Sequence, residues 1–175
     1  MPILSGIHTL GQHLEHLQSH SEDYLPDQCP SCGRAGLWRH GYYTRKSDRE
    51  GQGLNPIPIP RFRCPHCRRT CSSLPQCIPP RRWYLWAVQE LLIRLVLLGY
   101  SFNSVCHQWP PSRATLRRWW RRLQERFPRH RDALCARWPW AATAQGFRSF
   151  WRHCLSRQPL SEAMLMLLRV GVRMP

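Results

Sequence analysis

Apolar residues follow helical spacing at the start of the chain. Leu10, Leu14 and Leu17 recur at intervals of three and four residues, with several histidines nearby. This spacing predicts a short amphipathic helix within residues 1–27, its leucines packed on the rest of the protein. We interpret the nearby histidines as solvent-facing side chains rather than as metal ligands. They are His8, His13, His16 and His20.

A longer helical pattern follows two prolines at positions 79 and 80. Residues 83–98 predict one helix, and residues 99–101 end that helix and cap the next, where apolar residues again recur at helical spacing. The residues expected on the buried face of the first of these helices are Leu91, Leu92, Leu95, Val96 and Leu98.

A third helix is predicted over residues 113–126, after a turn with two prolines and with Ser112 as its N-cap. Its apolar stripe is formed by Leu116, Trp119, Trp120, Leu123 and Phe127. Its outer faces carry Arg113, Thr115, Arg117, Arg118, Arg121 and Arg122. Three helices with a short turn before an arginine-faced third helix are typical of a DNA-binding helix-turn-helix. The alternative is an ordinary bundle with one solvated, charged helix.

The pattern after Phe127 is interrupted by prolines at positions 128, 139 and 159. Apolar helical patches lie near residues 143–155 and 161–170, and Ser161 is expected to cap the last helix. We therefore expect short packing helices in this region.

Cysteines dominate the segment before the helical region. Two Cys-x-x-Cys motifs flank stretches with the composition of paired strands, residues 37–45 and 57–63. Two such motifs on separate turns can place four thiolates around one ion, and closed four-sulfur coordination favours structural Zn²⁺. The glycine after the first motif permits the positive φ that such a turn uses. The sequence therefore predicts a zinc ribbon with one ion held by Cys29, Cys32, Cys64 and Cys67.

The cysteines and the histidine near these motifs have other possible roles. An iron–sulfur cluster is compatible with the same spacing and stays open as an alternative. His66 lies between the two ligands of its motif and is expected to point outward. The remaining cysteines are expected to be buried structural residues. They are Cys71, Cys77, Cys106, Cys135 and Cys154.

These patterns predict an α+β protein, with a small β zinc ribbon followed by an all-α helix-turn-helix bundle and short C-terminal helices. The expected segments are an N-terminal helical segment (1–27), the zinc ribbon (28–78), the helix-turn-helix (79–127) and a C-terminal helical extension (128–175).

Charge indicates the class of partner. The chain has 175 residues and a net charge of +16, and Lys46 is its only lysine. Arginine suits bidentate recognition of phosphates and base edges. Between Arg61 and Arg131 lie 15 arginines and two acidic residues, so ion pairing within helices cannot be their main use. We therefore expect a polyanionic partner, double-stranded DNA.

The arginines are expected to divide between two roles. The N-terminal turns of a recognition helix face the major groove, where the candidates for base edges are Arg113, Thr115 and Arg117. The candidates for phosphate contacts on the same helix are Arg118, Arg121 and Arg122. The ribbon is expected to grip the backbone or a flanking groove through Arg39, Arg45, Arg61, Arg63, Arg68 and Arg69.

These motifs, taken in order, resemble a known family. The relevant stretches are Cys29-Pro-x-Cys32-Gly, Arg39-His-Gly-Tyr-Tyr-Thr-Arg45, Ile59-Pro-Arg-Phe-Arg-Cys-Pro-x-Cys67, Arg69-Thr70 and Leu116-Arg-Arg-Trp. Over residues 28–127 they resemble the N-terminal DNA-binding part of bacterial insertion-sequence transposases. Over nearly the whole chain the sequence resembles small, stand-alone, transposase-like proteins of unknown function, the DUF6431 group. The resemblance implies recognition of the terminal repeats of a mobile element.

The chain departs from those transposases in its acidic residues. Two-metal strand transfer requires clustered carboxylates, and after Asp132 the sequence contains only Glu162. We therefore expect a DNA-binding protein without a catalytic domain of its own, and not an enzyme. A transposase or a second copy of the chain is a further candidate partner.

Two other functions stay open. One is a protein-interaction adapter or transcriptional regulator that docks through a tryptophan-rich C-terminal region, with Trp138, Trp140 and Trp151 as candidate anchors. The other is RNA binding through aromatic stacking, which Tyr42 and Tyr43 permit. The N-terminus lacks the features of a signal peptide, and no apolar stretch is long enough for a membrane span. We therefore expect a cytoplasmic, nucleoid-associated protein with reduced thiols and no membrane partner.

Overall fold

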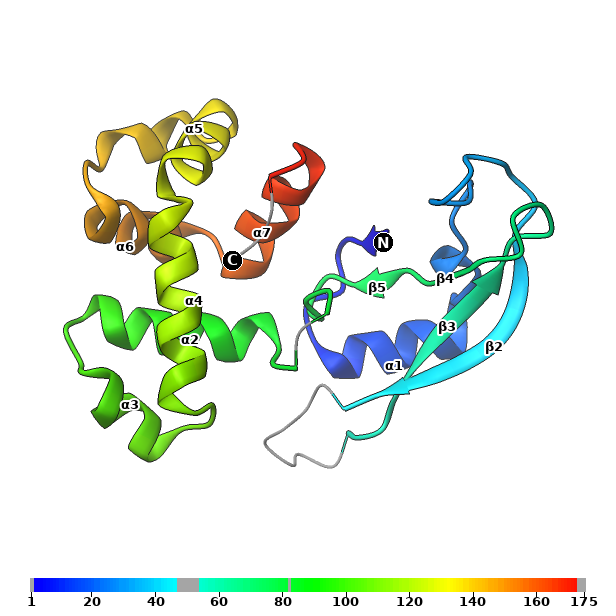
Figure 1. Ribbon diagram of the computed structural model, residues 1–175, viewed down its shortest axis with the longest axis horizontal. Coiled ribbons are helices and arrows are strands. Elements are labelled where there is room, and N and C mark those ends of the chain that lie inside the picture. The colour runs from blue at the N-terminus through cyan, green and yellow to red at the C-terminus, as the bar shows by residue number, and fades with distance from the viewer. Residues whose placement is uncertain (1, 47–53, 82, 173–175) are drawn as a thin grey trace. The chain divides into compact units, whose positions relative to one another are not determined.

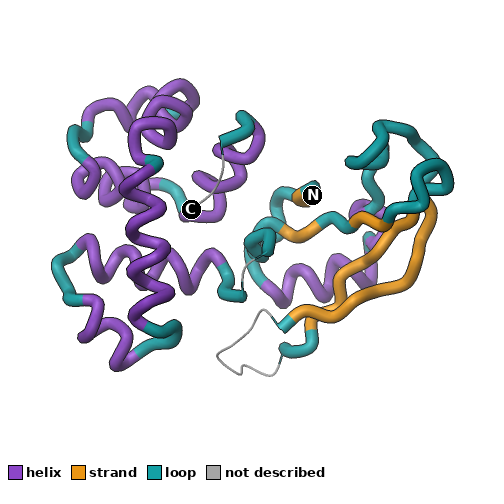
Figure 2. The backbone as a smooth tube through the Cα atoms, viewed as in Figure 1, coloured by secondary structure: helices purple, strands orange, loops and turns teal. Residues whose placement is uncertain are grey.

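The computed structural model describes residues 2–46, 54–81 and 83–172. The fold is mixed α+β, as the sequence predicts (Figure 1). The chain divides into two compact units, Met1–Leu85 and Trp86–Pro175, which we call unit 1 and unit 2. Figure 2 shows the strands in unit 1, while the described part of unit 2 is helical. No helix within the described ranges is long and apolar enough to cross a bilayer.

An antiparallel sheet forms the centre of unit 1. Its strands, in the order β2-β3-β4, are β2 (Trp38–Arg45), β3 (Ile57–Arg63) and β4 (Thr70–Cys71). The predicted pairing of residues 37–45 with 57–63 is thus confirmed, and their register shifts between Arg39 and Tyr42. Gly41 lies in this irregular stretch with φ +78°, a conformation that favours glycine.

Backbone hydrogen bonds join the N-terminal segment to the rest of unit 1. Strand β1 (Ile3–Leu4) pairs in parallel with β5 (Leu74–Pro75). Helix α1 (Leu10–Ser19) follows, and then the short 3₁₀ helix η1 (Ser21–Tyr24). A capping box starts α1, because the Thr9 hydroxyl accepts from the Gln12 N–H while the Gln12 side chain accepts from the Thr9 N–H.

Unit 1 has one apolar core, to which both cysteine motifs contribute. Leu10 of α1 is buried there and Leu17 packs against it, so the predicted helix does cover the body of the protein. The buried members of this core are Ile7, Leu10, Tyr24, Cys29, Leu37, Ile57, Ile59, Phe62, Cys64, Leu74, Cys77 and Ile78.

His13 contradicts the prediction that the N-terminal histidines face solvent. Its side chain is fully buried. Nε2 lies 2.9 Å from the Pro58 carbonyl oxygen, and Nδ1 lies 2.6 Å from the Tyr24 hydroxyl. Because a carbonyl can only accept, Nε2 carries the proton and Nδ1 accepts from Tyr24. His13 is therefore a satisfied core residue that links α1, η1 and β3.

Unit 2 begins with the three predicted helices, α2 (Trp86–Leu97), α3 (Phe102–Gln108) and α4 (Arg113–Glu125). The predicted buried face of α2 is correct for Leu92 and Val96, but Leu91 and Leu98 are 40% and 66% exposed. Ile93 and Leu97 are buried in their place, because the neighbouring helices cover a different face of α2 from the one we expected.

The helix caps follow the predictions only in part. Ser101 caps α3 as expected, with its hydroxyl accepting from the Ser104 N–H. Ser112 is the residue before α4, but its hydroxyl contacts the Thr115 hydroxyl at 3.2 Å instead of a backbone N–H. Ser161 is not a cap: it lies inside α7, whose N-cap is Pro159.

Up to Val172, the C-terminal region contains one α-helix and one 3₁₀ helix more than predicted. Pro128, which we expected to interrupt the helical run, stands in the first turn of α5, where its missing N–H costs nothing. The elements of this region are α5 (Phe127–Arg137), the 3₁₀ helix η2 (Pro139–Thr143), α6 (Phe147–Arg157) and α7 (Leu160–Arg169).

Helices α6 and α7 bond directly to α2. Arg148 and Arg152 of α6 donate to the carbonyls of Val96 and Leu97, in the last turn of α2. In the other direction, the Glu90 carboxylate accepts from the Leu160 N–H at 2.7 Å. The C-terminal region is thus part of the same bundle as the predicted helix-turn-helix.

Candidate metal centre and arginine surface

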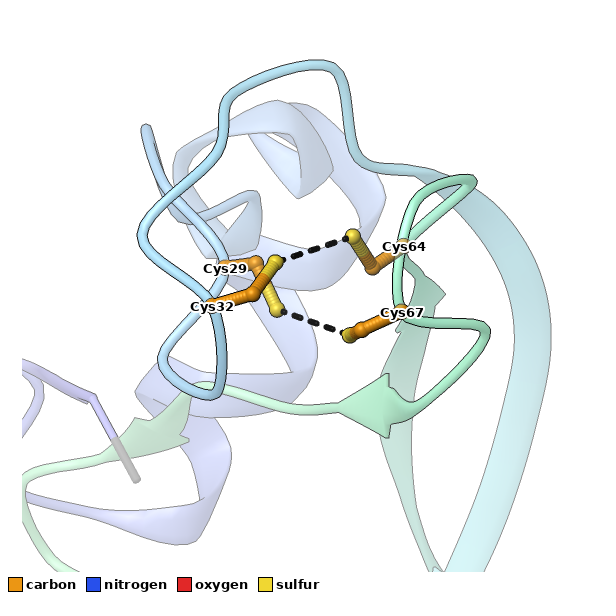
Figure 3. A group of neighbouring side chains, drawn as sticks. All are labelled: Cys29, Cys32, Cys64 and Cys67. Atoms are coloured by element: carbon orange, nitrogen blue, oxygen red, sulfur yellow. Dashed lines mark hydrogen bonds between the residues drawn. The ribbon is translucent and has the colours of Figure 1, made fainter.

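The four predicted cysteine ligands come together in unit 1. Two loops supply them, residues 29–34 before β2 and residues 64–69 between β3 and β4, which we call the first and second cysteine loops (Figure 3). Sγ of Cys29 lies 3.6 Å from Sγ of Cys67, and Sγ of Cys32 lies 3.6 Å from Sγ of Cys64. All four sulfurs lie within 4.8 Å of one another.

The two cysteine loops have the same backbone hydrogen bonds. In the first loop, the N–H of Cys29 bonds to the carbonyl of Arg34 at 2.8 Å, and the N–H of Gly33 returns to Cys29 at 2.8 Å. The equivalent bonds of the second loop join Cys64 to Arg69 and Arg68 to Cys64, each at 3.0 Å. Each loop is therefore a compact turn that holds two sulfurs on one side.

The left-handed position of each loop is filled differently. Gly33 has φ +72°, as the glycine after the first motif led us to expect. The equivalent residue of the second loop is Arg68, with φ +59°, a conformation that costs a residue with a side chain about 1–2 kcal/mol. The second loop thus adopts the same turn at the cost of local strain.

The spacing of the sulfurs fits one tetrahedral ion. With Zn–S bonds of about 2.3 Å, the sulfurs of such a site lie about 3.8 Å apart. The observed pairs, at 3.6 Å, are close to this value. Sulfurs this close leave no room for a cluster of several iron atoms between them. The donor set is therefore compatible with a single zinc ion.

Backbone N–H groups favour the thiolate forms that bind metal. The Ser31 N–H donates to Cys29 Sγ over 3.4 Å, and this bond lowers the pKa of the Cys29 thiol. In the second loop, the Cys67 N–H is the main cause that lowers the pKa of Cys64. Cys29 and Cys64 are buried, and Cys32 lies at the surface. The geometry thus favours the thiolate at Cys29 and Cys64, whereas desolvation and hydrogen bonds to the other sulfurs raise the pKa of the Cys32 thiol to about 11.

The neighbouring candidate ligands stay outside this site. His66 is exposed, with Nδ1 3.2 Å from the Arg34 guanidinium, consistent with the expected outward orientation. Cys77 and Cys154 are buried as predicted. The prediction of burial holds only in part for the others, which are half-buried: Cys71, Cys106 and Cys135.

The six arginines predicted to contact DNA from unit 1 do not gather at one point. Arg39 donates to the Ser21 hydroxyl at 2.6 Å, and half-buried Arg45 donates to the Pro79 carbonyl at 3.0 Å. Arg61 lies over the Tyr43 ring, 5.3 Å from its centroid. The others are half-buried Arg63 on β3 and exposed Arg68 and Arg69 on the second cysteine loop.

Helix α4 separates apolar and cationic residues onto opposite faces. Leu116, Trp119, Trp120 and Leu123 are all buried, as predicted, while Phe127 is half-buried at the start of α5. Of the six predicted contact residues on α4, Thr115 and Arg122 are half-buried. The exposed ones are Arg113, Arg117, Arg118 and Arg121.

Two residues of α3 hold the first arginines of α4, and neither was among the site residues predicted from the sequence. Arg113 donates to the Asn103 side-chain oxygen at 2.8 Å. The Arg117 guanidinium lies over the Phe102 ring, 5.8 Å from its centroid. The only sequence signal was their position in the first turn of α3, directly after its cap.

The next two arginines of α4 have partners within that helix. Arg118 donates to the Thr115 hydroxyl at 3.3 Å, and Arg121 pairs with Glu125 at 3.6 Å. An open depression runs along this surface. It is lined by Phe102, Arg113, Ala114, Arg117, Arg118, Trp120 and Arg121.

The three candidate tryptophan anchors behave differently from one another. Trp151 is fully buried in unit 2, so it cannot anchor a partner without unfolding. Trp138 and Trp140 are half-buried and stacked on each other, 5.5 Å apart, and Arg157 lies over the Trp140 ring. Only this stacked pair remains available for contact.

One comparison with known proteins gives a result. The family described as "Domain of unknown function (DUF6431)" matches residues 29–119. The match contains both cysteine loops, helices α2 and α3 and the first half of α4. It is shorter than the resemblance over nearly the whole chain that we expected, because residues 1–28 and 120–175 lie outside it. No curated protein and no solved structure matches the chain.

Proposed function

This chain belongs to the DUF6431 family, and from its geometry we propose that it binds double-stranded DNA sequence-specifically. In this proposal a zinc ribbon forms the scaffold of unit 1. A helix-turn-helix made of α2, α3 and α4 reads the duplex.

The observation that carries the proposal is the two-faced character of α4. One face is buried in unit 2, and the other presents four exposed arginines. Glu125 is the only carboxylate from Ser101 to Glu125, so α3, the turn and α4 offer a cationic surface with little internal neutralisation. A duplex has the opposite charge and a major groove wide enough for one helix.

The contacts of α4 support a division of roles. Arg113 and Arg117 lie in its first turns and are held by α3, which restricts their side chains before any partner binds. With Thr115, they are the candidates for base edges. The candidates for phosphates are Arg118, Arg121 and Arg122 of α4, supplemented by the arginines of unit 1.

The proposed role of zinc is structural. Four sulfurs complete the tetrahedron and leave no open position for a substrate or a water molecule. The apolar core of unit 1 includes Cys29 and Cys64, so metal binding and packing would stabilise the same structure.

The biological setting that we propose is a mobile element. It rests on the resemblance of the motifs to the DNA-binding part of bacterial transposases, together with the cationic surface of α4. The scarcity of acidic residues after Asp132 favours a protein that binds DNA on the bacterial nucleoid without cutting it.

The proposal can be tested by selecting sequences from random duplexes with the zinc-loaded full chain, and then measuring affinity against salt. If only Arg118, Arg121 and Arg122 neutralise phosphates, affinity should fall about 40-fold from about 50 to about 200 mM salt. Arg117→Ala should weaken binding to the selected sequence about 5- to 150-fold and relax the preference at one position.

Arg137→Ala is the matched control, because Arg137 is exposed at the end of α5, away from the proposed reading helix. It should leave the sequence preference unchanged. If Arg117→Ala weakens all sequences equally, Arg117 contacts phosphate and not a base. A flat salt response would contradict DNA binding and would favour the adapter function, for which the Trp138–Trp140 pair is the remaining contact surface.

A further inference from the structure

A second cationic surface lies on one face of the sheet in unit 1. Trp38 is the direct cross-strand partner of Arg63, so their side chains share a face. Arg61 lies two residues from Arg63 on β3 and therefore on the same face. Arg61 also stacks over Tyr43, which adds Tyr43 to this face. We call these four residues the aromatic–arginine face.

Trp38 stands out on this face because it is 56% exposed. Trp38 is not a member of the buried core of unit 1, and it does not belong to the candidate metal site, which is made of four cysteines. An exposed tryptophan keeps much of a large apolar ring in water, which is unfavourable in free energy. Tyr42 is equally exposed, but it pairs with Pro60, which places it on the other face of the sheet.

The charged residues of the two strands that form this face are all cationic. Neither β2 nor β3 contains an acidic residue, and both strands carry arginines. An apolar protein partner would cover the exposed Trp38 ring but leave the arginines without counter-charges. An acidic protein partner would pair with the arginines but leave the Trp38 ring exposed. A strand of unpaired nucleotides uses both, because bases stack on aromatic rings while phosphates contact guanidinium groups.

We infer that the aromatic–arginine face binds unpaired nucleotides, with one base stacked on Trp38 and the adjoining phosphates contacted by Arg61 and Arg63. The contact of Arg61 with Tyr43 restricts that guanidinium in advance. The ligand chemistry is a single-stranded stretch of either DNA or RNA. This inference extends the proposed function to a second nucleic-acid surface, and it does not depend on how α4 contacts a duplex.

The experiment compares three labelled probes of equal length by fluorescence anisotropy: a single-stranded DNA, an RNA of the same sequence, and a DNA strand whose central nucleotides are abasic. The zinc-loaded full chain should bind the probes with bases more tightly than the abasic strand. Trp38→Ala should weaken binding to those probes about tenfold and leave the abasic strand unchanged. Trp38→Phe should restore most of the loss, since a phenyl ring also stacks. The DNA and RNA probes show which source of unpaired bases is preferred.

Thr44→Ala is the matched control, because Thr44 is an exposed residue of the same strand on the face opposite to Trp38. It should change nothing. Equal binding of abasic and base-containing strands, or an equal loss on both in Trp38→Ala, would overturn the inference. If the chain still binds a duplex when the inference fails, the proposed function of α4 stands. If the chain does not bind a duplex but Trp38→Ala still weakens binding to the base-containing strands, only the proposal for α4 is rejected.

Discussion

Gly33 and Arg68 occupy the same position in the two cysteine loops, and both have positive φ. The first loop therefore uses the residue for which this conformation is easy, and the second does not. This difference can be measured, because the backbone hydrogen bonds of the two loops are otherwise equivalent.

Arg68→Gly should raise the free energy of unfolding by about 0.5–1 kcal/mol. The substitution relieves about 1–2 kcal/mol of backbone strain, which exceeds the additional entropic cost of ordering a glycine on folding. Gly33→Ala should lower it by about 1 kcal/mol, since a Cβ at Gly33 meets no atom within 4 Å and only the backbone conformation opposes it. Urea unfolding of the zinc-loaded protein measures both. A destabilised Arg68→Gly variant would show that the Arg68 side chain itself stabilises the loop.

His13 makes unit 1 sensitive to acid. Burial is the main cause that lowers its pKa below the ordinary value of 6.5. The folded protein therefore prefers neutral His13, while the unfolded chain takes up a proton near pH 6.5. The stability that His13 contributes is present above that pH and is lost as the pH falls below it.

The free energy of unfolding should therefore fall below about pH 6.5 less steeply in His13→Gln than in the natural protein, because the variant lacks the titrating group. Chemical unfolding at pH values from about 5 to about 7 measures the two slopes. The natural protein and the variant have the same cysteine site, so its acid dependence cancels when their slopes are compared. His8→Gln, at an exposed position, should have the slope of the natural protein. Equal slopes for all three proteins would mean that folding does not lower the pKa of His13.

At the scale of elements, the last turn of α2 is completed partly by the backbone N–H groups of residues 98–100 and partly by side chains of the C-terminal region. The last carbonyls of any helix lack partners within it, and cations near them are favourable. Here Arg148 and Arg152 of α6 supply both the donors and the charge. The sequence pattern predicted packing helices in the C-terminal region, but it did not predict their contact with the end of α2.

Arg152→Ala should lower the free energy of unfolding of unit 2 by about 1–2 kcal/mol, because it leaves the Leu97 carbonyl without its charged donor. Thermal unfolding followed by circular dichroism measures this loss. Arg137→Ala removes an equal charge from an exposed site and should have little effect. An equal loss in the two variants would assign the effect to net charge and not to the contact with α2.

At the scale of the whole molecule, each unit is a compact body with its own buried side chains. The core of unit 1 includes two of the four cysteines that can hold a metal. The large buried side chains of unit 2, such as Phe150 and Trp151, lie far from those cysteines in the sequence and belong to the helices. The stability of unit 1 alone should therefore depend on zinc.

Removal of zinc with a chelator should increase amide hydrogen exchange through unit 1 and leave that of unit 2 unchanged. Exchange followed by mass spectrometry of peptides separates the two units. Cys64→Ser should behave like the chelated protein and bind no zinc, whereas Cys71→Ser should keep one ion per chain. Unchanged exchange in unit 1 after chelation would show that the four sulfurs do not hold a structural metal.

Local patterns predicted much of this protein correctly. The spacing of the cysteine pairs identified four sulfurs that do lie together. Composition identified β2 and β3, and helical periodicity identified the buried stripe of α4. Each of these features depends on residues near one another in the chain, or on a chemical group that has few other uses.

Only the tertiary structure decided which of two apolar faces α2 buries, why His13 lies in a core, and what the C-terminal helices contact. Leu91 and Leu98 follow the same periodicity as the residues that are buried, so no count along the chain could separate them. His13 is buried because Tyr24 and Pro58, distant in the sequence, supply its two hydrogen-bond partners. Periodicity determines that a helix has an apolar face, whereas the packing of distant elements determines where that face lies.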